Sequence, residues 1–218
     1  MRQGIWDFWA PRYHALWVQH VSLGPTREAI IRYLSGLCDP VQVLDVGCGT
    51  GQMYQALRAA FPDVAICYRG IDQSRRMIEV ARNQVQGADV CFEVLDADRL
   101  EPDDGRHDVI ICTHAFPYFR DKPRVMDFFS RSLKENGRLL LAQACTDNTY
   151  DRAVLLFVRL TTSKAQYLSR AEVLGLADPL LGPPTYEERI GQQWWLPSIR
   201  MFAWQKQSGA EPGKESGI

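Results

Sequence analysis

Residues 43–51 have the sequence Val43-Leu44-Asp45-Val46-Gly47-Cys48-Gly49-Thr50-Gly51. A strand-like apolar run ends in three glycines at alternate positions, and a helical pattern begins at Gln52. Glycine has no Cβ atom, so a backbone of this composition can turn tightly and approach a ligand closely. A glycine-rich turn also occurs in plain strand-to-helix connections, so the rest of the chain must decide between the two interpretations.

Strand and helix patterns alternate on both sides of this loop. Strands are expected at residues 41–45, 65–71, 90–95, 108–112 and 139–143, and helices at 52–61, from the cap residue Ser74, and at 123–133. Such alternation predicts an α/β fold with a doubly wound, mostly parallel sheet. With the C-terminal runs included, we expect seven strands, helices on both faces and an antiparallel C-terminal edge strand.

The segments at the two ends of the chain are expected to pack around this central sheet. Trp6, Trp9, Tyr13 and Trp17 lie on one face of a predicted N-terminal helix, and a second helix is expected from Pro25. Helices are also expected at 151–168 and after the cap Ser169. The aromatic runs 192–196 and 200–205 are predicted to form an edge hairpin. The chain is therefore predicted to consist of an N-terminal helical cap (1–40), one domain (41–207) and a flexible tail (208–218).

Composition narrows the class of protein. The chain has 218 residues, with 25 Lys plus Arg against 26 Asp plus Glu, a formal net charge of −1, so no general positive field favours a nucleic-acid partner. The six cysteines are scattered without C-x-x-C pairs and are expected to be small buried side chains in a reducing compartment, with no metal site. No signal-like or membrane-spanning run is found, so a cytoplasmic location is expected.

The glycine loop also resembles a known motif. Asp45-Val46-Gly47-Cys48-Gly49-Thr50-Gly51 is similar to the first motif of the class I S-adenosylmethionine-dependent methyltransferases, and the resemblance extends over about residues 41–143. The spacing G-x-G-x-G differs from the dinucleotide fingerprint G-x-G-x-x-G, and the lysine of a phosphate-binding loop is absent. The resemblance implies S-adenosyl-L-methionine as cofactor, with Asp45, Gly47, Cys48, Gly49 and Gly51 at its site.

Acidic residues in register with this loop extend the predicted cofactor site. Asp72, with Gln73, follows the second expected strand, where a carboxylate can accept the ribose hydroxyls, although an aspartate there is also common as a turn residue. In the resembling family the next strand is followed by an adenine contact, which Asp96 and Ala97 match. Asp98 could take that role if the loop were shifted.

The end of the fourth strand supplies the remaining candidates. In the resembling family this end lies beside the methionine part of the cofactor, which makes Thr113 and His114 site residues. His114 is either a general base or a loop histidine bonded to backbone or water. Tyr13 is a further cofactor contact by analogy with small-molecule methyltransferases.

The resulting hypothesis is an enzyme that transfers a methyl group to a small-molecule acceptor by in-line displacement. Residues 116–119, Trp194 and Trp195 offer aromatic surface to such an acceptor or belong to the core. The alternatives are a protein or RNA methyltransferase, a non-catalytic scaffold subunit that binds S-adenosylmethionine, and a nicotinamide-dependent oxidoreductase, which the glycine spacing disfavours. The acceptor atom and the oligomeric state stay open.

Overall fold

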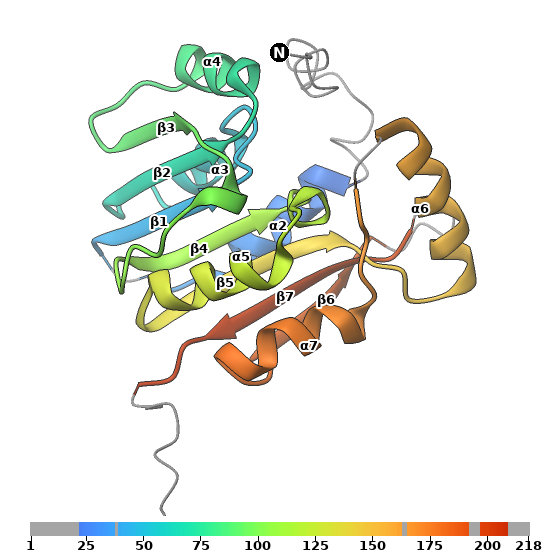
Figure 1. Ribbon diagram of the computed structural model, residues 1–218. Helices are drawn as coiled ribbons and strands as arrows, with labels where there is room; N and C mark the ends of the chain where they lie inside the picture. Colours follow the sequence, from blue (N-terminus) through green and yellow to red (C-terminus); the bar gives the residue numbers. More distant parts are fainter. Residues whose placement is uncertain (1–21, 38, 163–164, 192–196, 209–218) are drawn as a thin grey trace, which may run out of the picture.

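A computed structural model describes residues 22–37, 39–162, 165–191 and 197–208 of the chain (Figure 1). The predicted aromatic N-terminal helix with Tyr13, the aromatic run 192–196 with Trp194 and Trp195, and most of the expected tail lie outside these residues.

The described residues form one seven-stranded sheet in the order β3-β2-β1-β4-β5-β7-β6. The first five strands pair in parallel, and β7 pairs antiparallel with β5 and β6. The strands are β1 (Val41–Val46), β2 (Ile66–Asp72), β3 (Val90–Val94), β4 (His107–Thr113), β5 (Leu133–Ala144), β6 (Tyr186–Ile190) and β7 (Ile199–Gln205). The predicted fold class is confirmed, with the difference that the antiparallel strand β7 lies one position inside the edge strand β6.

Helices cover both faces of the sheet. On one face lie α2 (Gly24–Tyr33), α3 (Gln52–Ala60) and α4 (Arg75–Gln84). On the other lie α5 (Lys122–Ser132) and α7 (Arg170–Leu181), while α6 (Thr149–Thr162) follows β5. Two short 3₁₀ helices, η3 (Ala97–Arg99) and η4 (Phe116–Tyr118), follow β3 and β4.

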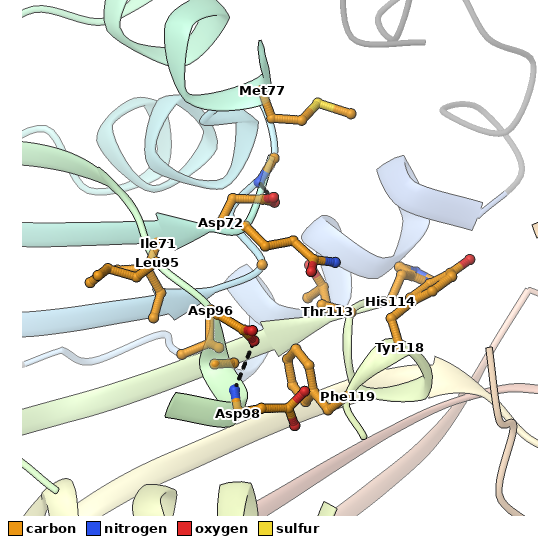
Figure 2. A pocket seen from close by; sticks show the side chains of 16 residues that line it. Ile71, Asp72, Met77, Leu95, Asp96, Asp98, Thr113, His114, Tyr118 and Phe119 are labelled. Atoms are coloured by element: carbon orange, nitrogen blue, oxygen red, sulfur yellow. Dashed lines mark hydrogen bonds between the residues drawn. The ribbon is translucent and has the colours of Figure 1, made fainter. Parts of the chain in front are cut away.

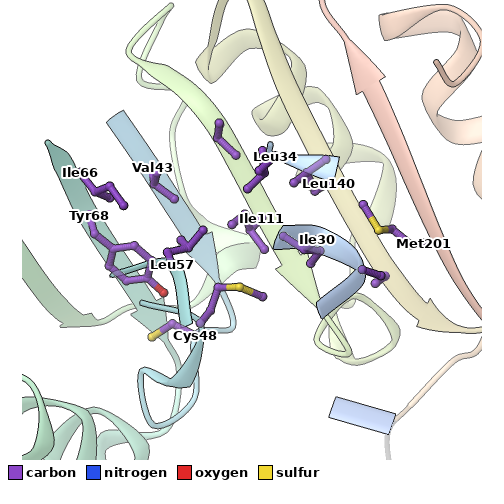
Figure 3. Close-up of a cluster of buried hydrophobic side chains, with 14 of the residues drawn as sticks. Ile30, Leu34, Val43, Cys48, Leu57, Ile66, Tyr68, Ile111, Leu140 and Met201 are labelled. Carbon is purple, nitrogen blue, oxygen red and sulfur yellow. The ribbon is translucent and has the colours of Figure 1, made fainter. Parts of the chain in front are cut away.

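Two hydrophobic clusters hold these layers together. Figure 3 shows the first, in which Ile30 of α2, Leu34 just after this helix and Leu57 of α3 pack on side chains of the sheet such as Ile111. The second joins α5 and α7 to the opposite face and contains Trp204 of β7. Burial of large apolar side chains on both faces fixes the register of the strands, because a shift of one residue would exchange the two faces.

Local sequence explains where several helices begin. The hydroxyl of Ser74 accepts the amide of Met77, and Ser169 forms a capping box with Glu172, so both predicted caps are confirmed. At the bulged start of β5, Asn136 takes the left-handed conformation, with φ 63°, which asparagine tolerates better than most residues.

Two predictions about the C-terminal part were wrong. The helix expected at 151–168 ends at Thr162, and Ala165 to Ser169 are not helical. The hairpin partner of β7 is β6, from Tyr186 to Ile190, and β5 pairs with the other side of β7, so the strand at 199–205 has a different partner from the one expected. The sequence did not predict β6, because its pattern, Tyr-Glu-Glu-Arg-Ile, is charged. Such a pattern is compatible with an edge strand, whose side chains are partly in contact with solvent.

The cysteines do not all behave as small buried side chains. Cys48, Cys112 and Cys145 are buried, but Cys67 and Cys91 are exposed. Both lie on a part of the sheet that no described helix covers, because the connection from β3 to β4 contains only η3. Within the described ranges, no helix has the length and apolar character needed to cross a membrane.

Candidate functional site

A pocket lies at the carboxyl ends of β1, β2 and β4 and beside the segment that follows β3. In sheets of this kind the strand order reverses between the first and fourth strands, and the crevice at that point is where ligands bind. The pocket is lined by Val46, Gly47, Gly49, Ile71, Asp72, Gln73, Met77, Leu95, Asp96, Ala97, Asp98, Thr113, His114, Ala115, Tyr118 and Phe119. Figure 2 shows Asp72 and Asp96 toward one end and His114 and Tyr118 toward the other.

The glycine loop forms one wall through backbone alone. Gly49 has φ 54°, and a Cβ atom built on it would meet nothing within 4 Å, so open space lies directly above its backbone. At Gly47, with φ 83°, a Cβ atom would come within 2.2 Å of the Ala115 side chain. Gly47 therefore lets the loops after β1 and β4 meet, while Gly49 leaves room for a ligand.

The carboxylate of Asp72 ties this loop to the next helix. One oxygen accepts the amide of Gly49 at 3.1 Å, and the other accepts the amide of Ser74 at 2.8 Å. Each carboxylate oxygen has more than one acceptor position, so Asp72 can also accept hydroxyl groups of a ligand. The turn-residue and ligand-binding interpretations of Asp72 are therefore compatible.

The structure gives Asp96 and Asp98 different environments. Asp98 accepts the amides of Arg120 (2.9 Å) and Asp121 (3.0 Å), which anchors the loop before α5. Asp96 accepts the amide of Asp98 with one oxygen and faces the exposed guanidinium of Arg120 with the other, at 3.2 Å. Asp96 accepts fewer backbone amides than Asp98, which leaves it more acceptor capacity for a ligand.

Thr113 ends β4, and His114 follows it with a left-handed backbone, φ 56°. The His114 ring reaches the start of α2, where its Nε2 lies 3.0 Å from the hydroxyl of Thr26 and 3.5 Å from that of Ser22, just before the helix. Burial, with a smaller effect of the positive charge of Arg27, lowers the pKa of His114 to about 4. The imidazole is therefore neutral at pH 7.

Three predicted cofactor residues do not line the pocket. Cys48 and Gly51 face the first hydrophobic cluster and the start of α3, and the Asp45 carboxyl is buried beneath the loop, where it accepts a very short hydrogen bond from the Tyr68 hydroxyl. Burial raises the pKa of Asp45 to about 7, although the bond from Tyr68 lowers it. These residues shape the loop from below. Tyr13 lies outside the described residues.

Sequence reasoning missed several apolar lining residues. Met77 lies in the first turn of α4 and Leu95 directly precedes Asp96, and as ordinary apolar residues they carry no signal of their own. The aromatic stretch 116–119 was noted, and the structure divides it: Tyr118 and Phe119 line the pocket, whereas Phe116 is fully buried in the second cluster. In the described part of the chain, no three His, Cys, Asp or Glu side chains are arranged to hold a metal ion.

Comparison with known proteins agrees with this geometry. Residues 43–137 match the family model described as a methyltransferase domain. An uncharacterized methyltransferase of Bacillus subtilis, YcgJ, is 31% identical over 185 residues, which cover 81% of this chain and 69% of that protein. A demethylmenaquinone methyltransferase of Thermotoga maritima is 33% identical over 111 residues, but the match spans 51% of this chain and only 47% of the relative.

The fold is also found among solved structures. A chain from a complex between the Haloferax volcanii Trm112 methyltransferase activator and a methyltransferase superposes with a TM-score of 0.77 at 18% identity, covering 95% of this chain and 100% of that one. At this identity the similarity concerns the fold.

Proposed function

Because the chain belongs to the class I S-adenosylmethionine-dependent methyltransferases, we propose that it transfers the methyl group of S-adenosylmethionine to a small-molecule acceptor. The observation that carries this proposal is the division of the pocket. Acceptor groups of Asp72 and Asp96 gather at one end, and His114, Tyr118 and Phe119 surround the other.

The residues at the first end suit the nucleoside part of S-adenosylmethionine. Asp72 has acceptor positions for the ribose hydroxyls, and Asp96 has one for the adenine amino group. Ile71, Met77 and Leu95 supply apolar surface for a flat base. The open space above Gly49 leaves the backbone accessible to the amino-acid part.

The cofactor supplies a methyl group that is already activated on a sulfonium sulfur. The protein must therefore hold an acceptor in line with that bond and keep water out. The rim formed by Thr113, His114, Tyr118 and Phe119 supplies apolar and aromatic surface beside the imidazole of His114. These side chains are sufficient to position a small organic acceptor.

Two features support a small acceptor over a macromolecule. The formal net charge of −1 supplies no general attraction for RNA. The name of the Thermotoga maritima relative refers to demethylmenaquinone, a small molecule. The Haloferax volcanii chain was solved with an activator protein, so a protein or RNA acceptor, or a need for a partner chain, is the competing proposal.

A transfer assay separates these proposals. The full chain is incubated with S-adenosylmethionine labelled in the methyl group, and label is sought in a panel of hydroxyl- and amino-bearing small molecules, in total protein and in total RNA. Label in the low-mass fraction supports the proposal, and label only in protein or RNA contradicts it. Binding of S-adenosylmethionine without transfer to any fraction would favour the scaffold interpretation.

A further inference from the structure

His114 is held in an uncommon way at the rim of the pocket. Its backbone is left-handed, with φ 56°, and its amide donates to the carbonyl of Ala142 at 2.7 Å. A residue other than glycine in this conformation needs surrounding contacts to keep it there, and such residues concentrate at functional sites. The ring is fixed at the same time by its contact with Thr26 on α2.

The hydroxyl of Thr26 decides which nitrogen of His114 carries the proton. Thr26 donates its single hydrogen to the carbonyl oxygen of Ser22 at 2.8 Å, since a carbonyl can only accept. The same hydroxyl lies 3.0 Å from Nε2 of His114 and must therefore accept from it. The neutral ring then has its proton on Nε2 and a lone pair on Nδ1.

We infer that Nδ1 of His114, in the tautomer fixed by Thr26, accepts the proton released by a hydroxyl group of the methyl acceptor. This inference rests on the proposed methyl transfer and names the acceptor class within it. No hydrogen bond to Nδ1 is found among the residues that the structure describes, and His114 lines the pocket. Thr26 is a positioning residue, because it acts only through His114.

The low basicity of His114 favours an oxygen acceptor over an amine. Burial and, to a smaller degree, the positive charge of Arg27 together lower the pKa of His114 to about 4. A methylated ammonium group is a weak acid and would keep its proton beside so weak a base. An oxygen that gains a methyl group before losing its proton becomes an oxonium, which is strongly acidic and releases the proton readily.

A hydroxyl acceptor takes the methyl group in a single displacement. The acceptor oxygen forms a bond to the methyl carbon while the bond from that carbon to sulfur breaks, and its electron pair stays on sulfur. The hydroxyl proton moves to Nδ1 of His114. The products are a methyl ether, S-adenosylhomocysteine and an imidazolium, which then passes its proton to water.

Nitrogen NMR of the full chain tests the tautomer without an acceptor. With ¹⁵N-labelled histidine at pH 7, two-bond proton–nitrogen spectra are expected to show His114 protonated at Nε2 alone. His114→Asn assigns the signal. Thr26→Val removes the hydroxyl at nearly constant volume and is expected to populate both tautomers, whereas Thr26→Ser keeps the wild-type pattern. Ser22→Ala removes the second hydroxyl near Nε2, at 3.5 Å, but keeps the carbonyl that Thr26 donates to, and is expected to keep the wild-type pattern.

Several outcomes would overturn the inference. A wild-type ring protonated at Nδ1, or charged at pH 7, contradicts it even if Thr26→Val fails to fold. An unchanged tautomer in a folded Thr26→Val protein would show that Thr26 does not fix the tautomer of His114.

The acceptor class is tested with labelled S-adenosylmethionine and matched panels of phenols, alcohols and amines. Transfer to hydroxyl compounds is expected, and it should fall by about 10²- to 10⁴-fold in His114→Asn with unchanged cofactor affinity. Asn is chosen because it tolerates the left-handed backbone. Transfer to amines alone overturns the acceptor class. Intact cofactor binding without any transfer overturns the small-molecule proposal instead.

Discussion

At the scale of single residues, Asp72 combines two roles that one substitution can expose. Asp72→Ala removes the acceptor of the Gly49 amide together with the proposed ribose contact. Charge-assisted hydrogen bonds of this kind are worth about 1.5–3 kcal/mol, so S-adenosylmethionine should bind roughly 10- to 150-fold more weakly. Titration calorimetry measures the change. The exposed Asp63, on the loop before β2, gives the matched control Asp63→Ala, and equal affinities of the two variants would refute the role of Asp72.

Gly49 allows backbone strain to be separated from ligand contact. Gly49→Ala places a Cβ atom at a residue with φ 54° and in the space left for the ligand. Gly36, in the turn after α2, also has a positive φ, 90°, and also has nothing within 4 Å of a built Cβ. Both alanine variants should lose about 1–2 kcal/mol of stability in urea unfolding, but only Gly49→Ala should lose cofactor affinity. Equal binding by both would show that Gly49 faces no ligand.

At the scale of elements, Asp98 connects η3 to the loop that carries the aromatic rim. Asp98→Ala leaves the amides of Arg120 and Asp121 without their acceptor and should lower the free energy of unfolding by roughly 1–3 kcal/mol. Binding of S-adenosylmethionine should weaken as well, because Phe119 lines the pocket next to this anchor. Asp127→Ala on α5, at a half-exposed position, should change stability by less than about 0.5 kcal/mol. A variant at Asp98 as stable as that control contradicts the anchoring role.

The elements that sequence predicts well are those whose pattern is set by burial. The strands β1 and β4 are largely apolar because helices cover both of their faces, and Ser74 and Ser169 mark helix starts by a local hydrogen bond. β6 escaped prediction because an edge strand can carry charges without cost. The end of α6 was not predicted, because no proline, glycine or capping residue marks the helix end at residue 162.

The site shows the same division between local and long-range information. The glycine loop, Asp72 and Asp96 follow strands directly and could be placed from register alone. The contact of His114 with Thr26 joins residues 88 positions apart, so no local sequence pattern predicts it. Asp45 looks like a ligand-binding residue in sequence, yet alternation along β1 turns it toward Tyr68.

At the scale of the whole molecule, three buried groups make stability depend on pH. Burial lowers the pKa values of His107 and His114 from 6.5 to about 4, so the unfolded chain binds two more protons between these values. Burial raises the pKa of Asp45 from 3.8 to about 7, so the folded chain binds one more proton there. The net difference is one proton, and stability should fall by about 1.4 kcal/mol per pH unit as the pH drops from 6.5 to 4.

His107→Leu tests this balance. Neither ring nitrogen of His107 has a hydrogen-bonding partner within the described residues, so an apolar side chain of similar size should cost little at pH 7. The remaining contributions of His114 and Asp45 then offset each other, and the free energy of unfolding in urea should become nearly independent of pH between 5 and 6.5. An unchanged slope would contradict the contribution of His107.

Binding of S-adenosylmethionine in the pocket at the ends of β1, β2 and β4 is tested by titration calorimetry of the full chain with S-adenosylmethionine, S-adenosylhomocysteine and NADH. We expect the first two to bind with one site per chain and NADH not to bind. Binding of NADH, or of none of the three, would contradict this expectation.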